Sequence, residues 1–101
     1  MNDLHGKIEM DYQNMIRKAD RLEELSRQLK AIADNDLGGL QKNVRSAWKG
    51  SSGELYQQKL NKLTANLQSQ ITALNRNARG IRTAAANMRR IEEAALARLK
   101  K

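Results

Sequence analysis

The sequence predicts an all-α protein, an antiparallel hairpin of two long helices. It is rich in Ala, Leu, Arg, Lys, Gln and Glu, which are strong helix formers, and it has no proline, the strongest helix breaker. Apolar residues recur at steps of three and four, which is the spacing of one buried stripe on a helix. No stretch alternates apolar and polar residues long enough to indicate a strand. The 101 residues fit one domain, 1–101.

The first helix is expected over about residues 4–49, with one weak place. Gly38-Gly39 follows Asp34-Asn35-Asp36, all of them poor helix residues. The apolar pattern nevertheless resumes in phase at Leu40, which predicts a weak or kinked stretch inside one helix. The alternative is a three-helix chain that is broken at Gly38-Gly39.

A sharp turn is expected at about residues 50–52, followed by a second helix over about 53–99. Gly50 can adopt the left-handed conformation that ends a helix. Ser51 and Glu54 have the S-x-x-E spacing of a capping box, in which the two side chains satisfy unpaired N–H groups of a new helix. Stop and start signals therefore coincide, and the second helix should run antiparallel to the first.

The apolar stripes are wider than the seam between two helices requires. A two-helix hairpin has no enclosed interior, so a wide apolar stripe predicts a second hairpin that completes a four-helix bundle. That second hairpin is either a copy of this chain or a different protein. The residues expected in the dimer or partner interface are Leu22, Leu25, Leu29, Leu60, Leu63, Leu67, Leu74 and Ile81.

The tripeptide Trp48-Lys49-Gly50 stands at the midpoint of the chain. A tryptophan on the last turn of the first helix can cap the apolar stripe, and Gly50 lets the backbone reverse. A chain of about one hundred residues with no cysteine, two long amphipathic helices and W-x-G at the midpoint resembles the WXG family of type VII secretion substrates. This family includes the early secreted antigenic target proteins and their partners. The resemblance covers the whole chain, as a pattern rather than as identity.

The resemblance implies a hairpin that dimerises into a four-helix bundle and is exported as a folded pair. It also implies that the turn, with Trp48 and Gly50, contributes to recognition by the secretion machinery, including its ATPase. The chain would be made in the bacterial cytoplasm and secreted without a conventional signal peptide, since residues 1–10 are polar and lack an apolar segment. No apolar run is long enough to cross a bilayer.

One feature of the family is altered in this sequence. Many family pairs carry a C-terminal Y-x-x-x-D/E export signal, but no tyrosine follows Tyr56. The nearest match has Met88 in the aromatic position and Glu92 in the acidic one. These two residues are either a degenerate export signal or a core methionine and a solvated glutamate. If the signal is missing, the partner carries it, as expected for companions that pair with the helical N-terminal region of LXG toxins.

The second half of the chain is strongly basic. Residues 51–101 hold ten Lys or Arg against three Asp or Glu. A basic face is expected to point away from the apolar stripe, formed by Arg76, Arg79, Arg82, Arg89 and Arg90. Such an array suits phosphates or an acidic protein partner. No DNA-binding motif is present and no aromatic residues interleave with the arginines, which speaks against nucleic acid. The alternative function is a non-secreted helical adaptor or a nucleic-acid-associated protein.

Catalytic groups are sparse. The only histidine is His5, there is no cysteine, and no E-x-x-H motif or Gly-rich phosphate loop is present. Catalysis needs such groups positioned against each other in a pocket. The sequence therefore predicts neither an enzyme nor a cofactor or metal site. Insertion into a membrane surface is not expected either, because the helices lack a Trp- or Phe-rich edge.

Overall fold

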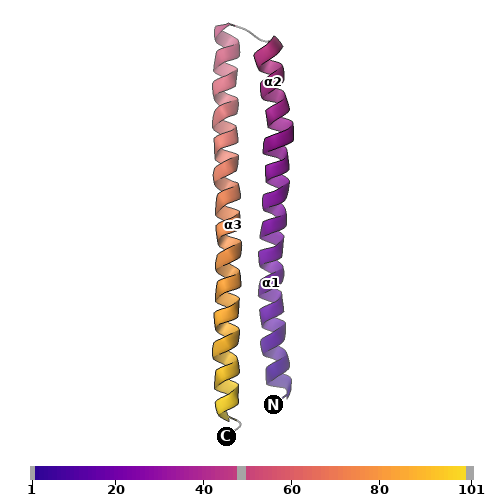
Figure 1. Ribbon diagram of the computed structural model, residues 1–101, viewed down its shortest axis with the longest axis vertical. Helices are drawn as coiled ribbons and strands as arrows, with labels where there is room; N and C mark the ends of the chain where they lie inside the picture. Colours follow the sequence, from indigo (N-terminus) through magenta and orange to yellow (C-terminus); the bar gives the residue numbers. More distant parts are fainter. Residues whose placement is uncertain (1, 48–49, 100–101) are drawn as a thin grey trace. The chain divides into compact units, whose positions relative to one another are not determined.

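The backbone is almost entirely helical. The structure, a computed structural model, describes residues 2–47 and 50–99. Its elements are an α-helix α1 (Asn2–Ala31), a π-helix η1 (Ile32–Leu37), and two further α-helices, α2 (Gly38–Ala47) and α3 (Ser51–Leu99). The chain reverses direction between α2 and α3 (Figure 1). The predicted all-α helical hairpin is confirmed for the described residues, in which only Gly50 lies outside a helix.

The chain forms two units, each of which pairs two helical segments. Unit 1 combines Met1–Glu23 with Asn75–Lys101, and unit 2 is Glu24–Leu74. In unit 1 the side chain of Arg82 reaches Asp20, whereas Arg89, later on α3, reaches the earlier residue Glu9. The two segments of unit 1 are therefore antiparallel. Unit 2 contains the chain reversal itself, so its two segments are antiparallel as well.

Small residues line the helix–helix seam of unit 1. Ala19 on α1 and Ala78 and Ala85 on α3 are almost completely buried. A small side chain at the contact lets two helix axes approach more closely than a leucine would, because the axial separation depends on the contacting side chains. Ile8 and Leu96, which are also buried, supply larger apolar side chains nearer the chain ends.

The seam of unit 2 mixes small and large residues. Its buried side chains are Ser26, Ala33 and Val44 on the helical segment before the turn, and Leu60 and Ile71 on α3. Along α3, buried and half-buried residues alternate at steps of four and three from residue 53 to residue 74. This is the repeat of a coiled-coil seam, which keeps one stripe of each helix against the other.

The π-helix η1 changes the spacing of this repeat. A π turn closes its hydrogen bonds between residues i and i+5, so it holds one more residue than an α turn. Leu25 and Ile32 are seven residues apart, but the next position in line is Leu40, eight residues further on. Gly38 is right-handed helical, with φ −61° and ψ −43°. The backbone thus stays helical through Gly38-Gly39, and the alternative of a chain broken there does not hold.

Candidate partner-binding surface

The turn is built around Gly50. Its φ of 105° lies in the left-handed region, which glycine adopts without steric cost. The backbone N–H of Glu54 donates to the Gly50 carbonyl oxygen at 3.0 Å, which is the first hydrogen bond of α3. Gly50 therefore holds the N-cap position and Ser51 is the first helical residue. The expected capping box, with Ser51 at the N-cap, differs from this arrangement by one residue. Trp48 lies outside the described residues.

Most of the expected interface residues lie at the seams within the two units. In unit 2, Leu60 is buried, and Leu29, Leu67 and Leu74 are half-buried. In unit 1, Leu22 of α1 and Ile81 of α3 are half-buried as well. All six follow the spacing of the seam. They pack between the two segments of their own chain, and this packing leaves less of their surface accessible to a second protein.

The other two, Leu25 and Leu63, belong to an exposed row in unit 2 that we call the apolar flank. Its members lie one residue before a seam position, and their exposed fractions are between 39% and 47%. The apolar flank consists of Leu25, Ile32, Leu40, Tyr56 and Leu63. In an antiparallel pair, positions that precede the seam residue on both helices fall on the same side of the seam. Leu40 keeps its place in this row because η1 takes up one extra residue.

The opposite side of the seam is polar. In unit 2 it holds Asn61, the residue directly after buried Leu60. The side-chain amide of Gln41 donates to the Asn61 Oδ1 at 2.6 Å, and that of Gln57 donates to the Gln41 carbonyl oxygen at 3.4 Å. The apolar flank and Asn61 thus lie on different sides of the seam, with Gln41 and Gln57 at seam positions between them. The only large apolar surface beside the seam of unit 2 is the apolar flank, as far as the described residues go.

In unit 1 the corresponding side is closed by arginines. The Arg82 guanidinium contacts Asp20 at 2.5 Å and Glu23 at 2.6 Å, and hydrogen bonds to Asp20 and then Glu23 raise the pKa of Arg82. Arg89 lies 2.8 Å from Glu9 and stacks over the ring of Tyr12, 4.4 Å from its centroid. Such a contact adds a cation–π attraction to the ion pair.

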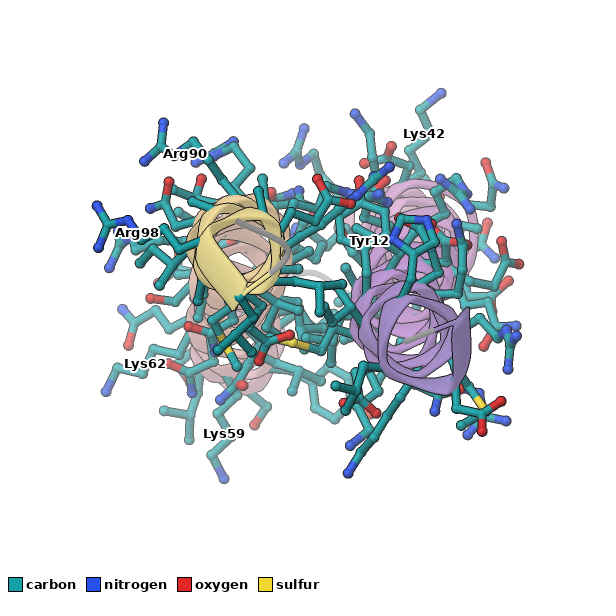
Figure 2. All side chains as sticks on the ribbon, turned by 90° about the horizontal axis from the view of Figure 1, so that it is seen from below. Tyr12, Lys42, Lys59, Lys62, Arg90 and Arg98 are labelled. Carbon is teal, nitrogen blue, oxygen red and sulfur yellow. The ribbon has the colours of Figure 1, made fainter. Side chains whose placement is uncertain are left out.

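These ion pairs change the basic face expected from the sequence. Arg82 and Arg89 contact carboxylates of α1, whereas both were expected to point away from the apolar stripe. Arg76, Arg79 and Arg90 are exposed. Figure 2 shows Arg90 extending outward from α3. The sequence could not separate the two groups, because the spacing along α3 does not reveal where the acidic residues of α1 lie.

A match to a protein family identifies the relatives of the chain. Residues 7–93 match the model of a family described as proteins of 100 residues with WXG, WXG100. The chain belongs to the WXG100 family. Neither the curated proteins nor the solved structures gave a match to it. Membership identifies a helical protein of the type that serves as a secretion substrate, in a family that is non-enzymatic.

The residues proposed as a degenerate export signal lie at the edge of the unit 1 seam. Met88 is 48% exposed and Glu92 is half-buried. Both line a shallow hollow with Tyr12, Met15 and other residues, and its free volume of about 10 Å³ holds roughly one water. In this WXG100 protein the two side chains thus share one face of α3, one turn apart, with part of Met88 reachable from solvent.

Two kinds of site are absent from the residues that the structure describes. Within them, no group of three or more His, Asp or Glu side chains is placed to hold a metal ion. No helix in the same residues is both long enough and apolar enough to span a membrane.

Proposed function

We propose that this protein is a substrate of a type VII secretion system and acts by pairing with a helical protein, either itself or a cognate partner. The observation that carries the proposal is the family match over residues 7–93, which spans both helical segments and the turn. The protein would be made in the bacterial cytoplasm and exported without a conventional signal peptide. Its contact with the machinery would include the secretion ATPase.

The need for a partner is supported by the apolar flank. Five large apolar side chains remain about two-fifths exposed on one side of unit 2. Contiguous apolar surface of this kind is characteristic of interaction sites, because burying it removes apolar area from water. A second helical hairpin placed there would complete a four-helix bundle.

Two sites are proposed to communicate with the machinery. The first is the turn, where Gly50 sets the reversal and Trp48 precedes it. The second is the pair Met88 and Glu92, in the positions of the export signal. If this pair does not act as a signal, the partner supplies one, and the protein is then a companion that pairs with the helical N-terminal region of an LXG toxin.

The nucleic-acid alternative loses support from the ion pairs. Arg82 and Arg89 are held by three carboxylates of α1. An arginine that is already paired inside the protein is less available to neutralise a phosphate, so fewer counterions are released from the nucleic acid on binding. The remaining exposed arginines have no aromatic neighbours on α3 that could stack on bases.

Export is the decisive test. A tagged chain is produced in a bacterium that has a type VII secretion system, and in the same strain without the secretion ATPase. We expect the chain in the culture medium only when the ATPase is present. A cytoplasmic marker protein, which should stay inside the cells of both strains, controls for lysis. Equal amounts in both media, or none in either with a coproduced partner, would contradict the proposal.

A Gly50→Ala variant tests the turn in the same assay. Alanine is strained at a φ of 105°, so the variant should disturb the reversal and reduce export. Gly39→Ala is the matched control, because Gly39 lies in a helix and a side-chain carbon there would meet no neighbouring atom within 4 Å. Export reduced equally by both substitutions would argue against a special role of the turn.

A further inference from the structure

We infer that the apolar flank of unit 2 binds a helix of a different protein, one that carries acidic residues along the edge facing α3. This inference rests on the proposed function for the existence of a helical partner. It adds the surface on which the partner binds, the charge of the partner helix, and the exclusion of a second copy of this chain.

The geometry of the apolar flank suits one helix. Leu25, Ile32 and Leu40 form a row about 20 Å long at 1.5 Å per residue, and α3 supplies Tyr56 and Leu63 on the same side of the seam. The steps along each row are close to seven residues, so an incoming helix with apolar residues every three to four positions can pack between the two rows. The row stays straight only because η1 takes up one extra residue.

Lysines border the apolar flank on α3. Lys59 lies three residues after Tyr56 and four before Leu63, so it neighbours both on the helix surface. Lys62 lies next to Lys59 on the outer side. Figure 2 shows both lysines extending outward from α3. Neither forms an ion pair with a carboxylate in the residues that the structure describes. A helix lying on the apolar flank would meet these ammonium groups along one of its edges.

The border on the other side makes a weaker demand. It contains Gln28 and the carboxylate of Asp36, so one charged group of opposite sign lies there. The occupant is therefore expected to be asymmetric, with its acidic edge toward α3. Complementary charge of this kind sets orientation and speeds association, and like charges in the same places cost free energy.

Charge also argues against a second copy as the occupant. The chain carries a net charge of +8, so two copies repel each other. Unit 2 holds seven Lys or Arg and four Asp or Glu. One of the four, Glu24, is already bound by Arg27 at 2.8 Å. A second copy would thus bring more cations than available carboxylates to Lys59 and Lys62.

Two synthetic peptides test the charge of the occupant. Both are helices with leucine in the same heptad positions, and their flanking residues are all glutamate in one and all lysine in the other. Each is fluorescently labelled and titrated with the full chain. We expect the glutamate peptide to bind at least tenfold more tightly at low salt, with an affinity that falls as salt rises. Equal affinities of the two peptides would overturn the inference.

Variants of the full chain locate the surface. Leu63→Glu places a charge in the apolar flank and should weaken binding of the glutamate peptide by tenfold or more. Leu55→Glu is the matched control, since Leu55 is an exposed leucine of α3 outside the flank, and it should bind as the unchanged chain does. The double variant Lys59→Glu with Lys62→Glu keeps the apolar flank and should reverse the preference between the peptides. Circular dichroism establishes that each variant is folded.

The solution mass separates the two possible occupants. We expect the chain alone at low micromolar concentration to have a mass near 11.4 kDa. A dimer that is lost in Leu63→Glu and kept in Leu55→Glu would show that a second copy occupies the flank, and it would overturn the inference. Such a result would leave ATPase-dependent export untouched. Conversely, selective binding of the glutamate peptide by a chain that is not exported would contradict the proposed function alone.

Discussion

The two units use the sides of their seams in opposite ways. In unit 1, Arg82 and Arg89 close one side by binding carboxylates on the facing helix, over a seam lined by alanines. In unit 2, among the residues that the structure describes, the corresponding side holds Asn61 with its amide hydrogen bond from Gln41, and the other side leaves five large apolar residues exposed. The same helical repeat therefore supports internal cross-linking at one place and an open binding surface at another. What differs is the residue placed next to the seam.

A single-residue deletion should lower the free energy of unfolding far more in α3 than in η1. Deleting Gln68 from α3 rotates the residues after it by about 100° relative to those before it. The seam residues either before or after the deletion then no longer face the other helix. We expect the free energy of unfolding to fall by about 3 kcal/mol or more. Deleting Asn35 from η1 removes the extra residue of the π turn and keeps the repeat, so the change should stay within about 1 kcal/mol.

Urea unfolding followed by circular dichroism measures both deletions. The comparison also tests whether η1 sets the phase of Leu40 and Val44. If deletion of Asn35 lowers the free energy of unfolding as much as deletion of Gln68 does, the extra residue of the π turn is required for the stability of the helix.

Truncation of leucines should separate the seam of unit 2 from its apolar flank. Leu60 is 6% exposed and Leu63 is 47% exposed, although they stand three residues apart on α3. Leu60→Ala should lower the free energy of unfolding by about 2–3 kcal/mol, because it removes buried methyl groups and leaves a cavity. Leu63→Ala should cost less than about 1 kcal/mol. Similar losses from both, measured by urea unfolding, would mean that the apolar flank is already covered within the chain.

The smallest effect is expected from the ion pairs of unit 1. Arg82→Gln removes the contacts to Asp20 and Glu23, both of which are partly exposed to solvent. The thermal midpoint should fall slightly at low salt, and the difference should disappear in 1 M NaCl, since exposed ion pairs contribute little and are screened. Arg76→Gln, at an exposed arginine, should leave the midpoint unchanged at both salt concentrations. A salt-independent loss in Arg82→Gln would indicate lost packing instead.

Helical periodicity predicted much of this fold but little of the surface. The steps of three and four, the absence of proline and the signals at Gly50 were enough for the all-α hairpin. The apolar stripe shows which face of each helix is buried. Which side chains meet depends on the axial alignment of the two helices, which the stripe does not give. For that reason the pairing of Arg82 with Asp20 and Glu23 was not foreseen.

The apolar flank shows the same limit. Leu60 and Leu63 read as equivalent members of one wide stripe, and only the packing in unit 2 separates the buried residue from the exposed one. The extra residue of η1 left two signals in the sequence, namely the poor helix residues around Asp34 and the step of eight residues from Ile32 to Leu40.

The aromatic residues give each unit its own spectroscopic label. There is no phenylalanine, and the two tyrosines are divided so that Tyr12 belongs to unit 1 and Tyr56 to unit 2. Arg89 covers the ring of Tyr12, whereas the ring of Tyr56 lies in the apolar flank. The ring resonances of the two tyrosines in an NMR spectrum can thus report separately on the cross-linked unit and on the occupied or empty flank, without any added probe.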